Sequence, residues 1–409
     1  MGPVSTSNAF EPRFLVVGAG SRGNNYARAI SASTKGKIGA VAEIDPFKRA
    51  EFGRKYIWGD QKAKAHESFS LCEDFISYEL KKRKANAQSI TAAQEEDQED
   101  QGRITGVFIC TLDDSHAPII RALAQLNLHI MCEKPLALSL SDCLSIKSTL
   151  EQYPAKLYSI GHVLRYSPHN ILLRKLLCEE QVIGEVVSIE HTEPIEDIVR
   201  TKGWDRAETV LMDKLGEDWD ESMSDEVVKG RSWYGRCVYE ADNDVCDEQT
   251  VVIGWESDGV VGEEHGRGRK QAIFHMTYPT QAQCQRRGRI YGTLGEMTYD
   301  GRTITVHTFA DGQTRAHLVP KQAPEVERSH GGGDWGLAGA FVNAVIACEA
   351  EEVSIKEAQW RFVGCDLEEI VRSHALVFAA EEARKGKMVV DLPQWEKEKY
   401  AAASSDRSG

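Results

Sequence analysis

The regular pattern of the chain opens with a short apolar run that stops abruptly at glycine. Residues 13–17 (RFLVV) are apolar at every position but the first, which is typical of a parallel strand buried on both faces. The glycine-rich turn 18–23 follows at once, then a helical pattern over 24–31 and a second apolar run over 37–42 that ends at Glu43. This order predicts a β-turn-α-β unit.

Apolar strands and amphipathic helices continue to alternate up to about residue 165, as a doubly wound sheet requires. We therefore predict an α/β fold in which a mobile tail at 1–12 precedes a doubly wound parallel sheet over residues 13–165. Its further strands are expected at 106–110, 129–132 and 157–160, with helices at 116–126 and 141–151.

From residue 166 the apolar runs become longer and are joined by short polar turns. This texture predicts a C-terminal α+β domain over 166–392 with an open, mostly antiparallel sheet, followed by a tail at 393–409. The basic segment 266–270 is typical of a solvated hairpin turn. Strands are expected at 186–190, 249–255, 271–278, 287–291, 295–300 and 303–308, and helices at 169–180, 335–349 and 367–384.

A polar insertion interrupts the first domain at about residues 81–103. Basic residues at 81–84 are followed by a run of glutamine, glutamate and aspartate at 94–101, with very few large apolar side chains. Such a segment cannot bury enough apolar surface to fold by itself. We expect it to be exposed and partly disordered.

Charge and cysteine content narrow the classes of partner. The 409 residues carry 49 Lys and Arg against 63 Asp and Glu, a net charge of −14, which repels nucleic acid and anionic membranes. The sequence shows neither a long apolar run nor the layout of a signal peptide, so a soluble, cytoplasmic protein is expected. Its ten cysteines include no C-x-x-C pair, which predicts reduced thiols and no metal site.

The turn Gly18-x-Gly20-x-x-Gly23 carries the first candidate chemistry, because it follows a buried strand and opens a helix. Gly18 permits the tight turn, Gly20 lets the backbone approach a pyrophosphate, and Gly23 allows close packing of helix and sheet. The N-terminus of the helix adds N–H groups and a positive dipole. The sequence therefore predicts a dinucleotide site rather than a plain glycine turn.

Glu43, 25 positions beyond Gly18, bears on the choice between NAD and NADP. A carboxylate at this strand end binds the adenosine ribose hydroxyls and repels a 2′-phosphate, which favours NAD. The basic side chains of Arg22, Lys48 and Arg49 could offset that repulsion, so both cofactors remain open.

Glu133-Lys134-Pro135 follows another strand, at the edge where doubly wound sheets bind ligands. A lysine there can exchange a proton with a substrate oxygen during hydride transfer. The alternative is an exposed loop lysine without a role. The proline is also compatible with a cis bond that aims the lysine.

Taken together, these motifs resemble the glucose–fructose oxidoreductase / inositol dehydrogenase / MocA family, and the polar insertion and cysteine content favour a fungal-type member. The resemblance covers roughly residues 13 to 392. It rests on 16–23 (VVGAGSRG), Thr111 with His116, 132–137 (CEKPLA), 161–168 (GHVLRYSP), 235–239 (GRCVY), 243–247 (NDVCD), 330–334 (HGGGD), 373–374 (SH) and 378–381 (FAAE).

The resemblance implies an N-terminal Rossmann domain that binds NAD(P), and a C-terminal domain whose open sheet forms a homo-oligomer interface. It also implies hydride transfer to or from a small polyhydroxy compound: a sugar, a polyol or a cyclic polyol acid of the quinate type. Lys134 matches the family's catalytic lysine, Thr111 and His116 match a loop beside the nicotinamide, and Arg165 matches a position at the domain junction. The expected cofactor contacts are Gly18, Gly20, Ser21, Arg22, Gly23, Glu43, Thr111, His116, Glu133 and Arg165.

The chain departs from the family in one respect. A helix with Lys-x-x-His-Asp-x-Asp, whose histidine partners the catalytic lysine, is usual after the strand that ends near His191, but the sequence has no His-Asp-x-Asp and reads as shortened between 194 and 235. His330 is the nearest substitute by motif. The glycines after it favour a turn, with Asp334 capping the next helix.

Three hypotheses about function follow. The first is an NAD(P)-dependent oxidoreductase, the second a non-catalytic NAD(P)-binding sensor of the same family, and the third a shortened gene product with a defective second domain. The segment 330–333 (HGGG) is also similar to the oxyanion loop of lipases, but the sequence has no G-x-S-x-G elbow, and it has no phosphate-binding G-x-x-x-x-G-K-[ST] loop.

Overall fold

The computed structural model describes residues 10–88, 102–153, 156–196, 224, 226, 246–255, 270–282 and 285–405. The chain divides into two compact units, one of Met1–Tyr166 with Arg328–Gly409 and one of Ser167–Glu327. Three features of the sequence analysis lie outside the described residues: most of the polar insertion, most of the basic turn and nearly all of the region that reads as shortened.

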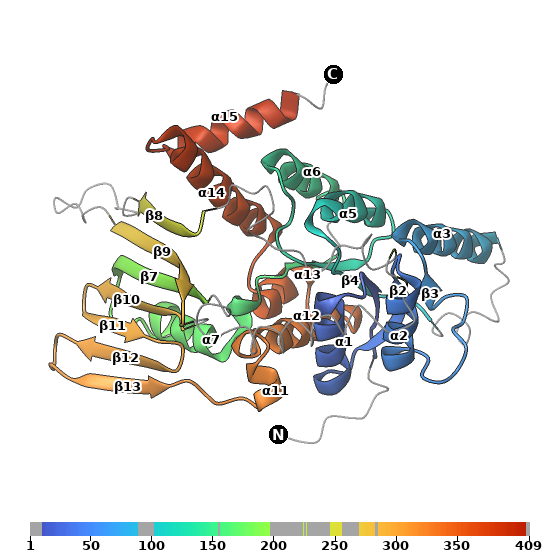
Figure 1. Ribbon diagram of the computed structural model, residues 1–409, viewed down its shortest axis with the longest axis horizontal. Helices are drawn as coiled ribbons and strands as arrows, with labels where there is room; N and C mark the ends of the chain where they lie inside the picture. Colours follow the sequence, from blue (N-terminus) through green and yellow to red (C-terminus); the bar gives the residue numbers. More distant parts are fainter. Residues whose placement is uncertain are drawn as a thin grey trace. The chain divides into compact units, whose positions relative to one another are not determined.

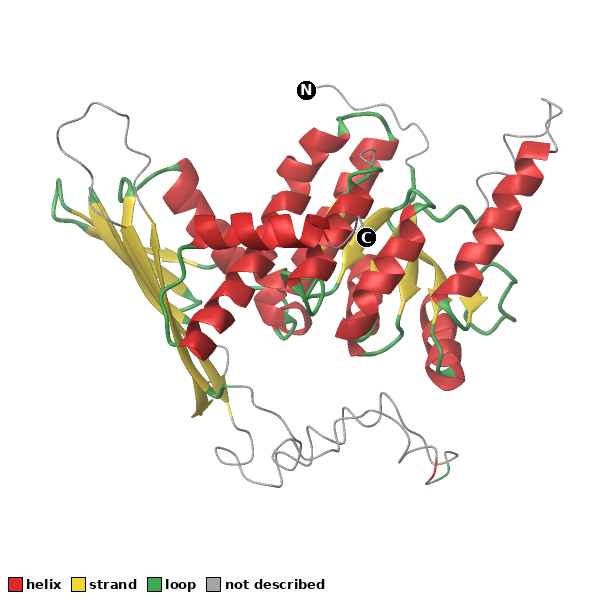
Figure 2. Cartoon of the chain, turned by 90° about the horizontal axis from the view of Figure 1, so that it is seen from above, coloured by secondary structure: helices red, strands yellow, loops and turns green. Residues whose placement is uncertain are grey.

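The first unit is built on a six-stranded parallel sheet in the order β3-β2-β1-β4-β5-β6 (Figure 1), which confirms the predicted doubly wound sheet. Helices flank this sheet (Figure 2). The strands are β1 (Arg13–Val17), β2 (Lys37–Ala42), β3 (Ser68–Phe69), β4 (Gly106–Ile109), β5 (His129–Cys132) and β6 (Tyr158–Ile160). The helices between them are α1 (Ser21–Ser33), α2 (Pro46–Tyr56), α3 (Cys72–Gln88), α5 (His116–Ala124) and α6 (Leu140–Leu150).

The C-terminal helices complete the core of this first unit. Phe341 of α12 packs edge-on against Phe108 of β4 at 5.4 Å between ring centroids, and Phe108 packs in the same way on Phe14 of β1 at 5.3 Å. All three rings are buried. The helices concerned are α12 (Gly333–Glu349), α13 (Ile355–Ala358), α14 (Leu367–Gly386) and α15 (Leu392–Ser405).

This packing differs from the expected division of the chain, which placed residues 166–392 in one C-terminal domain. The structure groups 328–392 with the sheet of the N-terminal unit. The physical reason is that α12 is apolar around most of its surface, with Leu337, Val342 and Val345 buried besides Phe341. A helix of this kind must be covered on several sides, and the Rossmann core covers it.

Two segments expected to lack regular structure are helical. The tail predicted at 393–409 is helix α15 as far as Ser405, and its Trp395 is buried against Ala375 and Ala379 of α14. The Trp395 indole N–H also donates to the Glu382 carboxylate at 2.8 Å. Helix α3 likewise extends to Gln88, through the first part of the predicted insertion. Val390 and Leu392 pack against the same cluster, so the charged helix α15 docks through a small apolar contact.

The second unit contains a seven-stranded sheet in the order β13-β12-β11-β10-β7-β9-β8. Only β7 and β9 pair in parallel, which confirms the predicted open, mostly antiparallel sheet. Helix α7 (Pro168–Arg174) lies against one face, and the short π-helix 175–179 supplies Leu176 to a core with Ile290 and Ile304. The strands are β7 (Val186–Glu196), β8 (Glu248–Trp255), β9 (Lys270–Thr280), β10 (Arg287–Gly292), β11 (Gly295–Tyr299), β12 (Thr303–Thr308) and β13 (Thr314–Leu318).

The cysteines of the described ranges are free thiols, eight in all. Burial raises the pKa of Cys72 and of Cys143 to about 12, and raises the pKa of Cys110 and of Cys132 well above its ordinary value. These thiols are therefore protonated at neutral pH and pack as small apolar groups. Cys237 and Cys284 lie outside the described residues.

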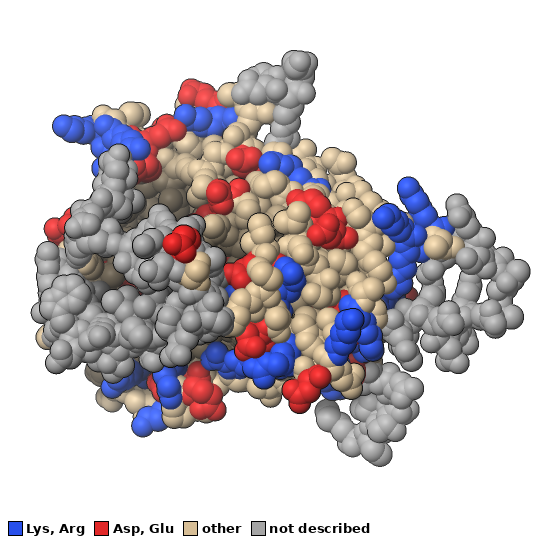
Figure 3. Space-filling model, turned by 45° about the vertical axis from the view of Figure 1, so that its right-hand side comes forward, with Lys and Arg blue, Asp and Glu red and all other residues tan. Residues whose placement is uncertain are grey.

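The surface carries both signs of charge. On the face drawn in Figure 3, acidic and basic side chains of the described residues are interspersed. Among the described residues, no helix combines the length and the apolar character needed to cross a bilayer.

Candidate active site

The predicted site residues gather at one edge of the parallel sheet because the strand ends are in register. Val17 of β1 pairs with Ile109 of β4, Ile109 with Cys132 of β5, and Cys132 with Ile160 of β6. The loops that follow these strands therefore leave the sheet side by side. The strand order reverses between β1 and β4, and such a switch point is where open α/β sheets bind ligands.

The glycine turn has the geometry that a pyrophosphate site needs. Gly18 has φ +93°, and a Cβ there would lie 2.7 Å from the carbonyl oxygen of Cys110. A Cβ on Gly23 would lie 2.1 Å from the carbonyl oxygen of Gly18. At Gly20, by contrast, a Cβ meets no described heavy atom within 4 Å. The turn is therefore closely packed at Gly18 and Gly23 and open at Gly20. Because Ser21 begins α1, the open position lies at the N-terminus of a helix, where anions bind.

Glu43 braces the same turn. Its carboxylate accepts hydrogen bonds from the backbone N–H of Ala19 at 2.7 Å and of Asp45 at 2.8 Å. Because the two oxygens of a carboxylate can accept about four hydrogen bonds, ribose hydroxyls can still be bound. Arg49 donates to the carbonyl oxygen of Glu43.

Arg22 points away from Glu43 and toward β5. Its guanidinium donates to the Glu133 carboxylate at 2.9 Å, to the Asp334 carboxylate at 2.7 Å and to the Tyr26 hydroxyl at 2.7 Å. The idea that Arg22 offsets the repulsion between Glu43 and a 2′-phosphate therefore needs correction, since two carboxylates already hold the guanidinium.

Glu133 is turned inward. Its carboxylate accepts from Arg22, from the Tyr26 hydroxyl and, at 3.1 Å, from the backbone N–H of Lys134. A Cβ on Gly161 would lie 2.9 Å from this carboxyl group, so the β6 loop also closes over it. Glu133 thus makes its contacts within the protein, and its contact with a cofactor stays a prediction.

Lys134 is exposed, and the Lys134–Pro135 peptide bond is cis, as the sequence allowed. Two buried histidines hold the backbone that follows. His116 lies 2.7 Å from the Pro135 carbonyl oxygen through Nδ1, and Nε2 of His374 accepts from the Leu136 N–H at 2.8 Å. The lysine therefore stands on a braced loop.

Thr111 and His116 are both expected beside a nicotinamide. Thr111 is partly exposed, whereas the His116 side chain is buried. His116 is completely buried, and its Nε2 lies 3.2 Å from the Thr111 carbonyl oxygen. The Thr111 hydroxyl accepts from Ser115 at 2.7 Å. A buried imidazole cannot touch a cofactor, so His116 can act only through the two carbonyl groups that it contacts.

Arg165 makes contacts within the first unit. Its guanidinium donates to the Gly364 carbonyl at 3.0 Å and to the Glu369 carboxylate at 2.6 Å. Both partners belong to the C-terminal part of the same unit. Arg165 thus fastens the short 3-10 helix Val163–Tyr166 to the start of α14.

His330 and Asp334 form a pair whose geometry differs from the expected helix cap. The N-cap of α12 is Gly332, with φ +92°. The Asp334 carboxylate accepts instead from Arg22 and lies 3.0 Å from Nδ1 of His330. Burial alone would raise the pKa of Asp334, but the hydrogen bonds from His330 and Arg22 outweigh burial and hold the pKa below its usual value.

Sequence reasoning overlooked three residues that the structure places at the site. Tyr26 and His374 support Glu133 and Leu136, and the imidazole of His162, in the β6 loop, stacks on that of His374 at 5.6 Å. Burial, followed by the charges around it, lowers the pKa of His162 to about 4. Both histidines stand in motifs visible in the sequence, but their pairing across some 200 residues leaves no local signal.

Comparison with known proteins defines the class. Residues 12–162 match the oxidoreductase family with an NAD-binding Rossmann fold known as GFO_IDH_MocA. This match confirms the resemblance drawn from the motifs of the first domain. The glycine turn and the strand ends described above lie within the matched residues.

Particular relatives are inositol dehydrogenases. Inositol 2-dehydrogenase of Rhizobium meliloti (strain 1021) is 28% identical over 318 residues, 75% of this chain and 81% of the relative. An inositol dehydrogenase homolog from Azotobacter vinelandii, solved with NADH and myo-inositol, has the same fold with a TM-score of 0.58 at 14% identity, over 92% of this chain and 97% of that one. An oxidoreductase from Sinorhizobium meliloti gives a TM-score of 0.62 at 16% identity, over 93% and 99%.

Proposed function

We propose that this protein is an NAD-dependent dehydrogenase that oxidises a secondary hydroxyl of a small polyhydroxy compound, with Lys134 as the group that takes the hydroxyl proton. The observation that carries the proposal is the position of Lys134. It is an exposed amine on a braced loop at the carboxyl end of β5, and β4 alone separates that strand from the one that ends in the glycine turn.

Besides Lys134, the reaction needs a hydride acceptor and a site that holds the dinucleotide. The dinucleotide supplies the acceptor for the hydride, that is, for the two electrons and the proton of the carbinol C–H bond. Lys134 in its neutral form accepts the hydroxyl proton as the carbonyl forms, and its ammonium form returns that proton in the reverse direction. The N–H groups at the start of α1 would hold the pyrophosphate.

NAD is the proposed cofactor. The Glu43 carboxylate stands at the end of β2, where it would bind the ribose hydroxyls and repel a 2′-phosphate. Arg22 is engaged by Glu133 and Asp334 and cannot reverse that preference from its present position.

A polyol is the proposed class of substrate, with inositols first because inositol 2-dehydrogenase of Rhizobium meliloti is among the relatives. Sugars and quinate-type acids remain predictions of the sequence, as does a cytoplasmic location.

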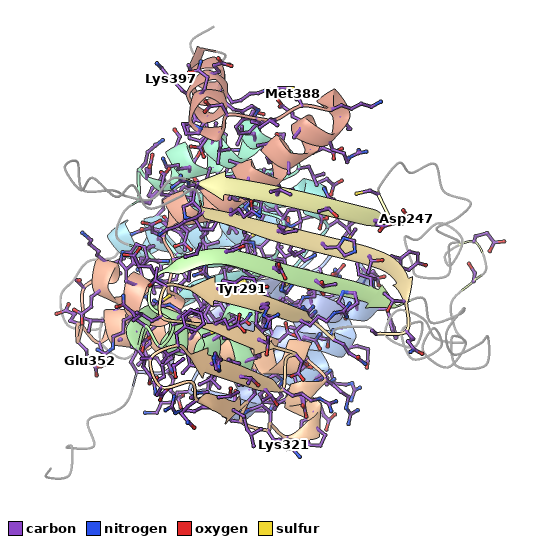
Figure 4. The ribbon with its side chains drawn as sticks, turned by 90° about the vertical axis from the view of Figure 1, so that its left-hand side faces the viewer. Asp247, Tyr291, Lys321, Glu352, Met388 and Lys397 are labelled. Carbon is purple, nitrogen blue, oxygen red and sulfur yellow. The ribbon has the colours of Figure 1, made fainter. Side chains whose placement is uncertain are left out.

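We also propose homo-oligomers formed through the seven-stranded sheet. Its face toward the viewer in Figure 4 carries Tyr291 of β10, and Val187 of β7 and Val252 of β8 are exposed in the same sheet.

The alternative function is an NAD-binding sensor. It is favoured by one observation, the absence of a His-Asp-x-Asp motif from the whole sequence. Residues 197–223, where the family carries that motif, lie outside the described part of the chain. Turnover therefore has to decide between enzyme and sensor.

The test is a fluorescence titration with NADH and NADPH, followed by a panel of inositols, sugars and cyclic polyol acids with the oxidised cofactor. Lys134→Met should lower turnover by about 10²–10⁴-fold, the range for a lost proton-transfer group, with NADH affinity nearly unchanged. Binding without turnover in the wild type would favour the sensor, and absence of binding would overturn both functions.

A further inference from the structure

A continuous chain of polar contacts joins three separate segments of the first unit: the glycine turn, the Glu133-Lys134-Pro135 loop and the start of α12. It runs from Asp334 through Arg22 to Glu133, and from Glu133 to the backbone N–H of Lys134. Every link is a hydrogen bond of 3.1 Å or less. The exposed lysine is thus connected to a carboxylate 200 residues away in sequence.

The charges in this chain depend on one another. The side chains of Glu133 and Asp334 are only 6% and 1% exposed, and both bind the single guanidinium of Arg22. A buried carboxylate is tolerated only while it is paired. Removal of Asp334 would therefore leave Arg22 with only Glu133 and the Tyr26 hydroxyl as partners, and a shift of the guanidinium would act on Glu133.

The backbone fixes Asp334 independently of its side chain. Gly331 and Gly332 have φ of +63° and +92°, which few other residues adopt, and they set the start of α12. A Cβ on Gly333 would lie 2.4 Å from the carbonyl oxygen of Val163. The start of α12 is therefore packed closely against the loop that follows β6, and this packing fixes the position of the Asp334 backbone.

We propose that Asp334 is a positioning residue for Lys134. Its carboxylate orients Arg22, Arg22 orients Glu133, and Glu133 holds the Lys134 N–H, so that the amine is placed for proton transfer. This role rests on the proposed function of Lys134. Because Arg22 lies within the glycine turn, the same contacts join the cofactor turn to the lysine loop.

The structure offers a matched control at the other end of the same helix and the same strand. Glu349, near the end of α12, binds Nε2 of His129 at 3.0 Å, and His129 is the first residue of β5. The Glu349 side chain is also largely buried, at 13% exposure. Glu349→Gln therefore disturbs an equivalent buried carboxylate that lies far from Lys134 along the strand.

The experiment compares Asp334→Ala, Asp334→Asn and Glu349→Gln in the full chain. It measures NADH affinity, kcat and KM for the best polyol, the solvent isotope effect on kcat, and hydrogen exchange of the Lys134 amide. The exchange measurement needs no activity, so it tests the contacts even if the proposed function fails.

Asp334→Ala should lower kcat by about 100-fold, the cost of a small misplacement of a catalytic group, with less than a threefold change in NADH affinity. The solvent isotope effect should increase, and the Lys134 amide should exchange at least ten times faster. Asp334→Asn, which keeps an acceptor for Arg22, should lie between Asp334→Ala and the wild type. Glu349→Gln should change none of these quantities at Lys134.

Unchanged exchange and an unchanged isotope effect in Asp334→Ala would overturn the positioning role. An equal fall of kcat in Glu349→Gln would overturn it as well, since the effect would then be general destabilisation. A wild type without turnover would overturn the proposed function alone, and the exchange rates would still support or overturn the hold of Asp334 on the Lys134 backbone.

Discussion

The imidazole of His374 accepts a 2.8 Å hydrogen bond from the backbone N–H of Leu136, two residues beyond the lysine of the site. Its Nδ1 lies 2.8 Å from the Ile370 carbonyl oxygen, so the ring is neutral and carries its proton on Nδ1. Burial lowers the pKa of His374 and keeps it in this form. A loop in the first domain thus depends on a helix 238 residues later.

This relationship predicts the effect of removing the acceptor. His374→Ala leaves the Leu136 N–H buried without a partner, which should cost about 1–3 kcal/mol of unfolding free energy. His374→Gln can still accept the bond and should cost less. Urea denaturation of the two variants measures the difference, and equal losses would contradict the importance of the acceptor.

The three glycines of the turn should respond differently to alanine. Gly23→Ala places a Cβ against the Gly18 carbonyl, so its melting temperature should fall. Gly20→Ala meets no described atom and should leave the melting temperature within about 2 °C, yet weaken NADH binding at least tenfold because the methyl group occupies the approach of the pyrophosphate. Thermal melts with NADH titrations decide, and normal NADH affinity in Gly20→Ala would argue against this site.

Glu43→Gln should change cofactor choice. It removes the charge that would repel a 2′-phosphate, so the ratio of NADPH to NADH affinity should rise by about tenfold. Glu51→Gln, on the exposed side of α2, makes the same change in net charge and serves as the control. A shift of the ratio in both variants would point to overall charge rather than to the ribose site.

The free energy of unfolding should fall in acid because of Glu349. Its hydrogen bond with His129, together with Lys156, lowers the pKa of Glu349 from 4.5 to about 2. A carboxylate with a depressed pKa stabilises the folded state above pH 4.5, and this contribution disappears as the pH falls toward 2. The contribution should be about 2 kcal/mol, and Glu349→Gln should flatten the profile of unfolding free energy over that range. An unchanged acid slope would show that other groups cause it.

Local patterns were sufficient for five strands of the parallel sheet and for most of the second sheet, because each of these strands carries its own apolar run and its own glycine or polar boundary. They did not reveal β3, which is only two residues long. They were insufficient for α15, whose docking depends mainly on Trp395, and for β13, whose residues are almost all exposed. Local signals also could not show which domain contains α12. A helix that is apolar on all sides does not reveal which sheet will cover it.

The site divides in the same way. Gly18, Gly20 and Gly23 were recognisable because the turn is continuous in sequence and its demands are backbone demands. The inward orientation of Arg22 and Glu133 was not, since the second carboxylate that holds Arg22, that of Asp334, lies 312 residues after it. A charged residue in a binding motif is expected to face the ligand. Only the fold shows that the Asp334 carboxylate binds Arg22 from within the protein.

The packing of Phe341 on Phe108 and Phe14 has a consequence for how the chain is made. During synthesis the strands that carry Phe14 and Phe108 leave the ribosome well before α12, so the parallel sheet has one incomplete face until residues 333–349 have emerged. The nucleotide-binding half, although continuous as a motif over 12–162, therefore matures only after the second sheet has been translated.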